Sequence, residues 1–173
     1  TTRICGVCPV AHHMAGTKAL DDAFNVEPTE TAKMLRELMY CGYFIYDHIL
    51  HFYFLGGPDF VVGPEAPPAE RNILGVIKKS GLEVGKEVIK HRAYGQKITA
   101  ILGGKATHPV TGLPGGIAKF LTEEERKEIE EMVRSSVEFA KFSLQLFDQI
   151  VLKNMEYVEM IKSDAYTLPT YYM

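Results

Sequence analysis

The side chains best suited to chemistry lie near the start of the chain, at Cys5, Cys8, His12 and His13. Thiolates and imidazoles bind soft and borderline metal ions. Because Gly6 lies between the cysteines and can form a tight turn, both sulfurs can point towards one ion. The spacing therefore predicts a metal or redox site whose two sulfurs lie roughly 4 Å or less apart, given thiolate–metal bonds of about 2.3 Å.

Two other kinds of Cys-x-x-Cys site fit the sequence less well. A thioredoxin-like motif follows a buried strand and opens the helix of a βαβ unit, and the sequence offers no such strand. A closed zinc site needs two further ligands, whereas the only other cysteine, Cys41, lies alone in an apolar run. An isolated thiol or zinc-binding fragment remains an alternative.

Three segments resemble signature sequences of nickel-iron hydrogenase large subunits, in the same order and at similar spacing. The first is the pattern Arg-x-Cys-Gly-x-Cys-x-x-x-His, formed here by Arg3, Cys5, Gly6, Cys8 and His12. The second is Asp-His-Ile-Leu-His-Phe-Tyr at 47–53, and the third is Gly-Gly-Lys-Ala-Thr-His-Pro at 103–109. One such motif is a weak signal, whereas three in order are not expected by chance.

The resemblance implies roles for four residues. Cys5 and Cys8 correspond to nickel ligands, and Cys8 to the thiolate that also bridges to an iron carrying carbon monoxide and cyanide. Asp47 corresponds to an aspartate that holds a catalytic arginine from the C-terminal part of the large chain. His108 lies in a loop that approaches an iron–sulfur cluster of the small subunit, so we interpret it as a hydrogen-bond donor towards that cluster.

Sequence spacing places three further residues beside these. His12 follows Cys8 by one helical turn and can direct a ring N–H towards its sulfur, so we expect a hydrogen-bond donor rather than a ligand. Arg3 precedes the first thiolate by two residues and is expected to act on the site electrostatically or to brace the loop. His51 lies one turn after Asp47 and can pair with it.

The other histidines and the third cysteine are expected to be structural. His13 points about 100° away from His12 along a helix and is expected to be a packing or surface residue. His91, beside Arg92 on a polar helix face, is expected to be solvated. Cys41, inside an apolar run, is expected to pack in the core.

The activity that the resemblance implies is reversible heterolytic cleavage of H2 at a nickel-iron centre. Electrons then pass to iron–sulfur clusters on a small subunit. The Cys-Pro-x-x-His-His stretch and the short loop before Pro58 most resemble the cytoplasmic enzymes of methanogens. These reduce a deazaflavin or are linked to a heterodisulfide reductase, and the sequence does not choose between the two. The alternative in another class is a non-catalytic, hydrogenase-like structural or electron-transfer subunit, but that lineage lacks the cysteine pair.

Two features of the family do not occur in the 173 residues: a second Cys-x-x-Cys near the C-terminus and an acidic residue upstream of the first motif. We therefore expect an internal or truncated portion of a large subunit. Its partners would be the remaining C-terminal part and the small subunit. The chain alone would then be inactive.

Composition limits the other classes of partner. The formal net charge is −3 and no run is rich in Lys or Arg, which argues against a nucleic-acid partner. The apolar run at 38–55 carries Asp47, His48 and His51, each costly in lipid, so it is predicted to be a core helix rather than a membrane insertion. No signal peptide is visible and a cytoplasmic location is expected, although any export signal would lie on the small subunit.

The sequence predicts a mainly α fold, a long-helix bundle forming one helical unit over residues 1–173. Apolar periodicity between glycine and proline breaks predicts helices at 9–24, 29–55, 69–102 and 122–155. The third helix can be interrupted at 80–81. The break at 56–58, a proline-rich loop at 63–68 and a glycine-rich loop at 103–116 separate the helices.

Overall fold

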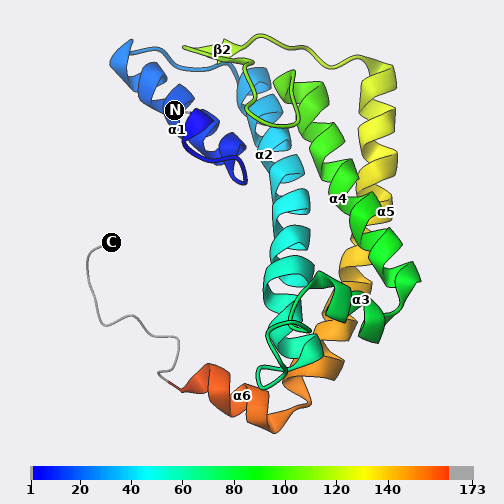
Figure 1. The fold of residues 1–173 in the computed structure, drawn as a ribbon. Helices are drawn as coiled ribbons and strands as arrows, with labels where there is room; N and C mark the ends of the chain where they lie inside the picture. Colours follow the sequence, from blue (N-terminus) through cyan, green and yellow to red (C-terminus); the bar gives the residue numbers. More distant parts are fainter. Residues whose placement is uncertain (1, 164–173) are drawn as a thin grey trace.

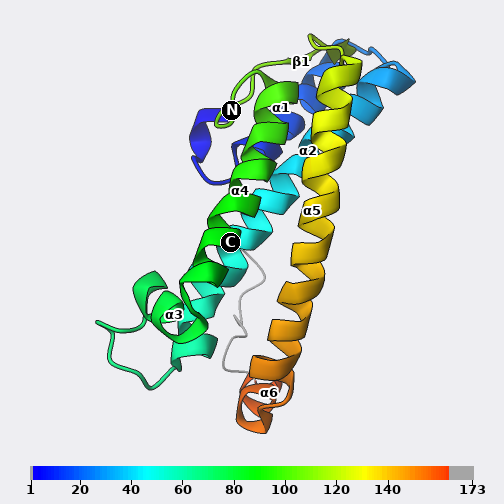
Figure 2. The ribbon, with the colours of Figure 1, turned by 90° about the vertical axis from the view of Figure 1, so that its right-hand side faces the viewer.

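The computed structural model describes residues 2–163 and is mainly helical, as predicted (Figure 1). Its six α-helices are α1 (Pro9–Ala23), α2 (Glu30–Leu50), α3 (Ile73–Ser80), α4 (Leu82–Gly103), α5 (Glu123–Phe147) and α6 (Met155–Lys162). The long helices α2, α4 and α5 form the bundle, and α4 contacts both of the others (Figures 1 and 2). α1 runs obliquely beside the first half of α2.

Local capping signals explain why two of the bundle helices, α2 and α5, begin near their predicted starts. The hydroxyl of Thr29 accepts a hydrogen bond from the backbone N–H of Ala32 at the start of α2. At α5, the hydroxyl of Thr122 accepts from the N–H of Glu125, and the carboxylate of Glu125 accepts from the N–H of Thr122. Such a reciprocal capping box satisfies donors that the helix itself leaves free.

The sequence predicts that the second helix ends at 56–58, and this prediction is wrong. Beyond α2 the chain continues helically through two π-helical segments, His51–Gly56 and Pro58–Val62, and turns only at Gly63, whose φ is 114°. Proline inside an α-helix clashes with the carbonyl four residues earlier. A π-helical turn is wider than an α-helical one, and Gly57 keeps helical dihedrals. Pro58 therefore begins the second π-helical segment without ending the helix.

Two other helix boundaries differ from the predicted ones. The third helix begins at Ile73 rather than at residue 69, because the side chain of Asn72 caps it by accepting from two backbone N–H groups. The predicted interruption at 80–81 is confirmed by Gly81, whose φ is 91°. The last helix does not run unbroken to residue 155: a π-helical segment, Asp148–Leu152, follows α5, and α6 begins anew after Asn154.

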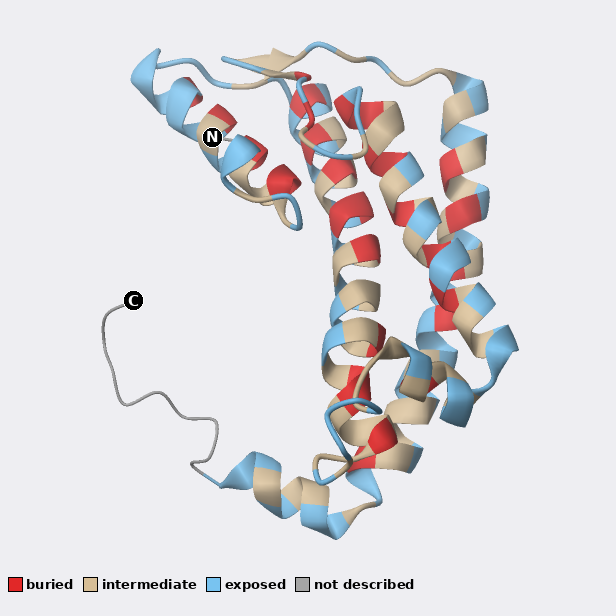
Figure 3. Cartoon of the chain, viewed as in Figure 1, coloured by how far each residue is buried: buried red, intermediate tan, exposed pale blue. Residues whose placement is uncertain are grey.

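The core lies where α1, α2, α4 and α5 face one another (Figure 3). Its main cluster of buried residues comprises Val10, Met14, Met39, Tyr43, Tyr46, Ile98, Leu102, Ile129 and Met132. α2 and α4 approach closely at a pair of glycines. A Cβ on Gly95 would lie 2.7 Å from the carbonyl oxygen of Gly42, so this crossing requires a glycine.

The apolar run at 38–55 is buried on one face only. The aromatic residues Tyr43, Tyr46 and Tyr53 are buried, whereas Phe44 is 42% exposed and Leu55 is 60% exposed. The expectation of a core helix is therefore met on the side facing α4. Within residues 2–163, no helix combines the length and apolar character needed to cross a membrane.

The glycine-rich loop after α4 contains a short hairpin that the sequence does not predict. Strand β1 (Gly112–Leu113) pairs antiparallel with β2 (Gly116–Ile117), with Gly112 opposite Ile117. The turn between them uses Gly115, whose φ is 73°. The hairpin contacts both α1 and α2, so the loop joins the N-terminal helix to the bundle.

Candidate metal site

The paired cysteines lie in a turn between a short 3-10 helix, Thr2–Ile4, and α1. The Sγ atom of Cys5 accepts hydrogen bonds from the backbone N–H groups of Val7 and Cys8, each at 3.3 Å. The Sγ atoms of both cysteines and a ring nitrogen of His12 lie within 4.8 Å of one another. The turn therefore directs both thiols into one region.

The start of α1 fixes Cys8 beside this turn. Pro9 is the first residue of the helix, a position that suits its fixed φ and missing N–H. Cys8 is the N-cap residue, and its side chain makes no capping hydrogen bond, which leaves the thiol available to a ligand. Val10 and Met14 belong to the main core cluster and hold this end of the helix against the bundle.

The two thiols differ in acidity. Hydrogen bonds from the backbone N–H and the side chain of Cys8, and from the N–H of Val7, lower the pKa of Cys5. Donation of its own proton towards Cys5, together with burial, raises the pKa of Cys8. Cys5 is therefore the thiolate that forms first, and the thiolate is the form of cysteine that binds metals.

Asp47 lies on α2 and acts on the cysteine pair through its charge. Its carboxylate contributes to raising the pKa of Cys8, after the larger effects of Cys5 and burial. Burial first, and then Asp47, raise the pKa of Tyr43 to about 12. The carboxylate is 24% exposed, and an Oδ atom lies 3.8 Å from the ring of His48. The expected pairing of Asp47 with His51 is wrong, because His48 takes that place and His51 is exposed.

Arg3 and His108 lie on other segments. Arg3 belongs to the 3-10 helix before the cysteine turn and is exposed. His108 is half-buried in the loop between α4 and β1 and has a φ of 59°, an uncommon value for a residue other than glycine. The structure thus brings Cys5, Cys8 and His12 together, with Asp47 nearby.

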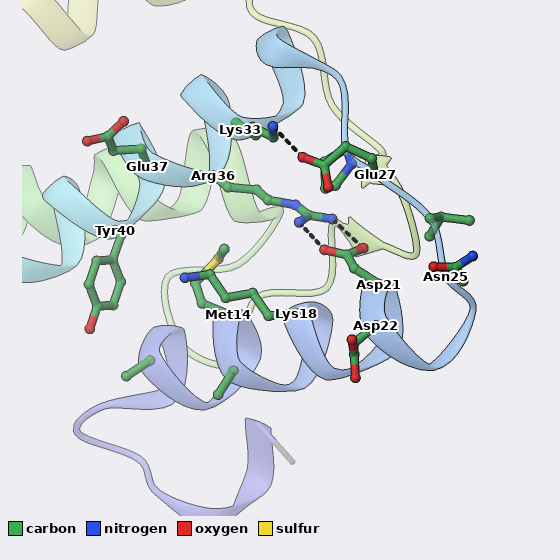
Figure 4. A pocket seen from close by; sticks show the side chains of 14 residues that line it. Met14, Lys18, Asp21, Asp22, Asn25, Glu27, Lys33, Arg36, Glu37 and Tyr40 are labelled. Atoms are coloured by element: carbon green, nitrogen blue, oxygen red, sulfur yellow. Dashed lines mark hydrogen bonds and ion pairs between the residues drawn. The ribbon is translucent and has the colours of Figure 1, made fainter.

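A buried ion pair at the opposite end of α1 from the cysteine turn was not expected from the sequence. Arg36 of α2 donates to both carboxylate oxygens of Asp21 of α1, at 2.6 and 3.2 Å (Figure 4). The two side chains are 6% and 12% exposed. Both side chains line a groove of about 940 Å³ between α1 and α2. The Arg36 guanidinium, by hydrogen bonding, holds the pKa of Asp21 below its usual range.

Two residues expected to be structural are placed differently by the structure. His91 is not solvated but only 2% exposed, since it stacks on Phe139 with ring centroids 4.4 Å apart. Its Nε2 lies 3.1 Å from the hydroxyl of Ser135, which ties α4 to α5. Cys41 does not pack in the core of the described chain but is exposed on α2. The polarity of the neighbouring residues in sequence does not show which face of a helix packs against another helix, and for this reason both predictions are wrong.

Comparisons with known proteins agree with the three motifs. Residues 1–74 match the family model for nickel-dependent hydrogenases. The chain is 53% identical over 171 residues to a vhu subunit of the F420-non-reducing hydrogenase of Methanocaldococcus jannaschii, covering 99% of this chain and 40% of the relative. It is 51% identical to an iron-sulfur subunit of the F420-non-reducing hydrogenase of Archaeoglobus profundus, covering 98% of this chain and 35% of the relative.

The fold agrees as well. A crystal structure of an NAD+-reducing nickel-iron hydrogenase in the H2-reduced state superposes with a TM-score of 0.69 at 34% identity, covering 86% of this chain and 34% of that one. The chain thus spans 35–40% of the length of the two curated relatives. Motif order, sequence identity and fold together identify the chain as a portion of a nickel-iron hydrogenase large subunit.

Proposed function

We propose that the chain forms part of the catalytic subunit of an H2 oxidoreductase, in which it supplies two thiolate ligands of a nickel-iron centre. The observation that supports this proposal is the convergence of Cys5, Cys8 and His12 within 4.8 Å. Two thiolates suit a soft, redox-active metal better than carboxylates do. The donor set therefore fits the metal centre that the family implies.

In this proposal the thiolates of Cys5 and Cys8 would hold the metal centre. A bound nickel-iron centre, its iron carrying carbon monoxide and cyanide, supplies the redox chemistry for heterolytic cleavage of H2. His12 donates a ring N–H to the sulfur of Cys8 and so orients that ligand. Asp47 places a negative charge beside the thiols and can hold a cationic side chain from another part of the large subunit.

The remaining assigned residues serve the surroundings of the centre. Arg3 offsets negative charge at the first thiolate or braces the turn. His108 donates a hydrogen bond towards an iron–sulfur cluster of a small subunit. His51 does not pair with Asp47 but follows it by one helical turn. We propose that it lies beside the nickel-iron centre.

The proposed partners are a small subunit with iron–sulfur clusters, the remaining C-terminal part of the large subunit, and H2. The two curated relatives are named as hydrogenases that do not reduce F420, a deazaflavin. Their names favour the other acceptor class considered above, a heterodisulfide-reductase partner. A cytoplasmic location remains part of the proposal.

H2-dependent reduction of a viologen dye tests how much of the large subunit this activity needs. We expect no turnover by the purified 173-residue chain, because the resemblance implies four nickel thiolates, of which Cys5 and Cys8 are two and the second Cys-x-x-Cys of the family supplies the others. Activity should appear only in the assembly that also contains the C-terminal Cys-x-x-Cys segment and the iron–sulfur subunit. Dye reduction by the chain alone, at a rate that follows its nickel content, would contradict this expectation.

A further inference from the structure

One face of α1 carries a row of buried polar residues that the proposed function does not use. His13, Thr17 and Asp21 are spaced by four, so they share one side of the helix. Counted over the whole residue, each is at most 9% exposed. Polar groups are rarely buried in this way without specific partners. The Thr17 hydroxyl donates to the carbonyl oxygen of His13 within α1, so His13 and Asp21 are the two that need partners on neighbouring elements.

The element that both of them contact is the glycine hairpin β1–β2. The backbone N–H of Gly112 donates to Nε2 of His13 at 2.9 Å, and the N–H of Gly115 donates to Oδ1 of Asp21 at 2.7 Å. The contact leaves no room for a side chain. A Cβ on Gly112 would overlap the Thr17 hydroxyl and would lie 2.8 Å from Nε2 of His13. The hairpin therefore packs directly against the row of buried polar residues on α1.

Arg36 joins this contact to the bundle. Besides binding Asp21, its guanidinium donates to the carbonyl oxygens of Leu113 at 2.8 Å and of Gly116 at 2.7 Å. A single side chain of α2 thus holds the far end of α1 and both strands of the hairpin. Between the two helices lies the groove of about 940 Å³, so apolar packing does not fill this side of α1.

The orientation of α1 matters to the candidate metal site because successive helical residues point about 100° apart. With His13 bonded to the hairpin, the direction of His12 is set, and Cys8 lies at the same end of the helix. We propose that the hairpin at 112–117, acting through His13 and Asp21, is a positioning element that fixes the rotation of α1 and holds His12 and Cys8 facing Cys5. This inference rests on the proposed metal site.

Two glycines of the same hairpin provide a matched test. In Gly112→Ala the new Cβ overlaps the side chains of Thr17 and His13, so the contact between the hairpin and α1 must shift, whereas a Cβ on Gly116 meets nothing within 4 Å and its carbonyl is retained in Gly116→Ala. The probe is Co²⁺ added to the 173-residue chain and followed by thiolate-to-cobalt absorption. We expect Gly112→Ala to weaken Co²⁺ binding by about tenfold or more and Gly116→Ala to leave it unchanged. Equal Co²⁺ affinities in the two variants would overturn the inference.

A second pair of variants separates positioning from stability. His13→Gln retains an acceptor for the Gly112 N–H, whereas His13→Leu does not. Positioning predicts that Gln restores Co²⁺ affinity relative to Leu, at equal helical content by circular dichroism. If Co²⁺ affinity falls only in proportion to lost helical content in every variant, the role is merely structural and the inference fails.

Hydrogen exchange distinguishes failure of this inference from failure of the proposed function. Gly112→Ala should speed amide exchange in Pro9–Ala23 relative to Gly116→Ala, whether or not a metal binds. If the unaltered chain binds no Co²⁺, the exchange comparison alone decides whether the hairpin orients α1. Equal exchange in the two variants would refute that orienting role.

Discussion

Replacing Cys5 or Cys8 with serine is expected to remove nickel from the assembled hydrogenase and to lower H2-dependent dye reduction by more than about a hundredfold. Even changes in residues around a metal's ligands commonly cost about 10–100-fold, and these variants remove a ligand itself. A serine hydroxyl stays protonated at neutral pH and offers a hard oxygen in place of a soft thiolate. Nickel content and dye reduction measured on the same samples check this.

Cys41→Ser is the matched control for these variants. Cys41 is exposed on α2 and lies outside the group formed by Cys5, Cys8 and His12. We expect it to retain both nickel and activity. Full nickel content in Cys5→Ser or Cys8→Ser, or equal losses in Cys41→Ser, would show that the first two cysteines have no special role in metal binding.

Replacing Arg36 with methionine is expected to lower the free energy of unfolding of the chain by about 3–5 kcal/mol, because it leaves the buried carboxylate of Asp21 without its cation. The same change removes the donors to the carbonyls of Leu113 and Gly116. Urea denaturation followed by circular dichroism measures the loss. In the double variant Asp21→Asn/Arg36→Met no charge remains buried, so it should be more stable than Arg36→Met alone. A double variant no more stable than the single one would contradict this account.

The ion pair also predicts a pH dependence. The pKa of Asp21 is lowered in the folded chain by Arg36, so the folded state binds fewer protons than the unfolded state near that pKa. The stability it contributes is complete above the unfolded-state pKa of about 3.9 and is lost as the pH falls through the folded-state value. Unfolding measured down the acid range should therefore show a steeper loss for the unaltered chain than for the double variant. Equal slopes would mean that Asp21 is not the group responsible.

Helix existence could be predicted from sequence, because capping and periodicity are local. Thr29 and Thr122 lie at the starts of predicted helices and cap them in the structure. The continuation past 56–58 could not be predicted, since glycine and proline end an α-helix, and nothing local shows that the chain adopts the wider π-turn. The break after α5 was missed for the same reason, because the π-helical segment there has no distinct sequence signal.

In the candidate site, too, local features could be predicted from the sequence and contacts between distant elements could not. The cysteine turn follows from spacing within a few residues. The Asp21–Arg36 pair, the docking of the hairpin on α1 and the burial of His91 depend on contacts between elements distant in sequence. One signal was present: His13, Thr17 and Asp21 repeat every four residues. A polar repeat of that kind ordinarily marks a solvated helix face, so it did not indicate a contact.

The most direct test of the metal site is elemental analysis combined with infrared spectroscopy on the purified assembly that contains this chain. If Cys5 and Cys8 hold a nickel-iron centre, nickel and iron will be present together with carbon monoxide and cyanide bands, and both the nickel and the bands will be lost in Cys5→Ser and Cys8→Ser. Zinc alone would indicate a thiol-bound zinc site, and no metal would indicate a structural subunit. Either of these two results would contradict the assignment of a nickel-iron centre to this cysteine pair.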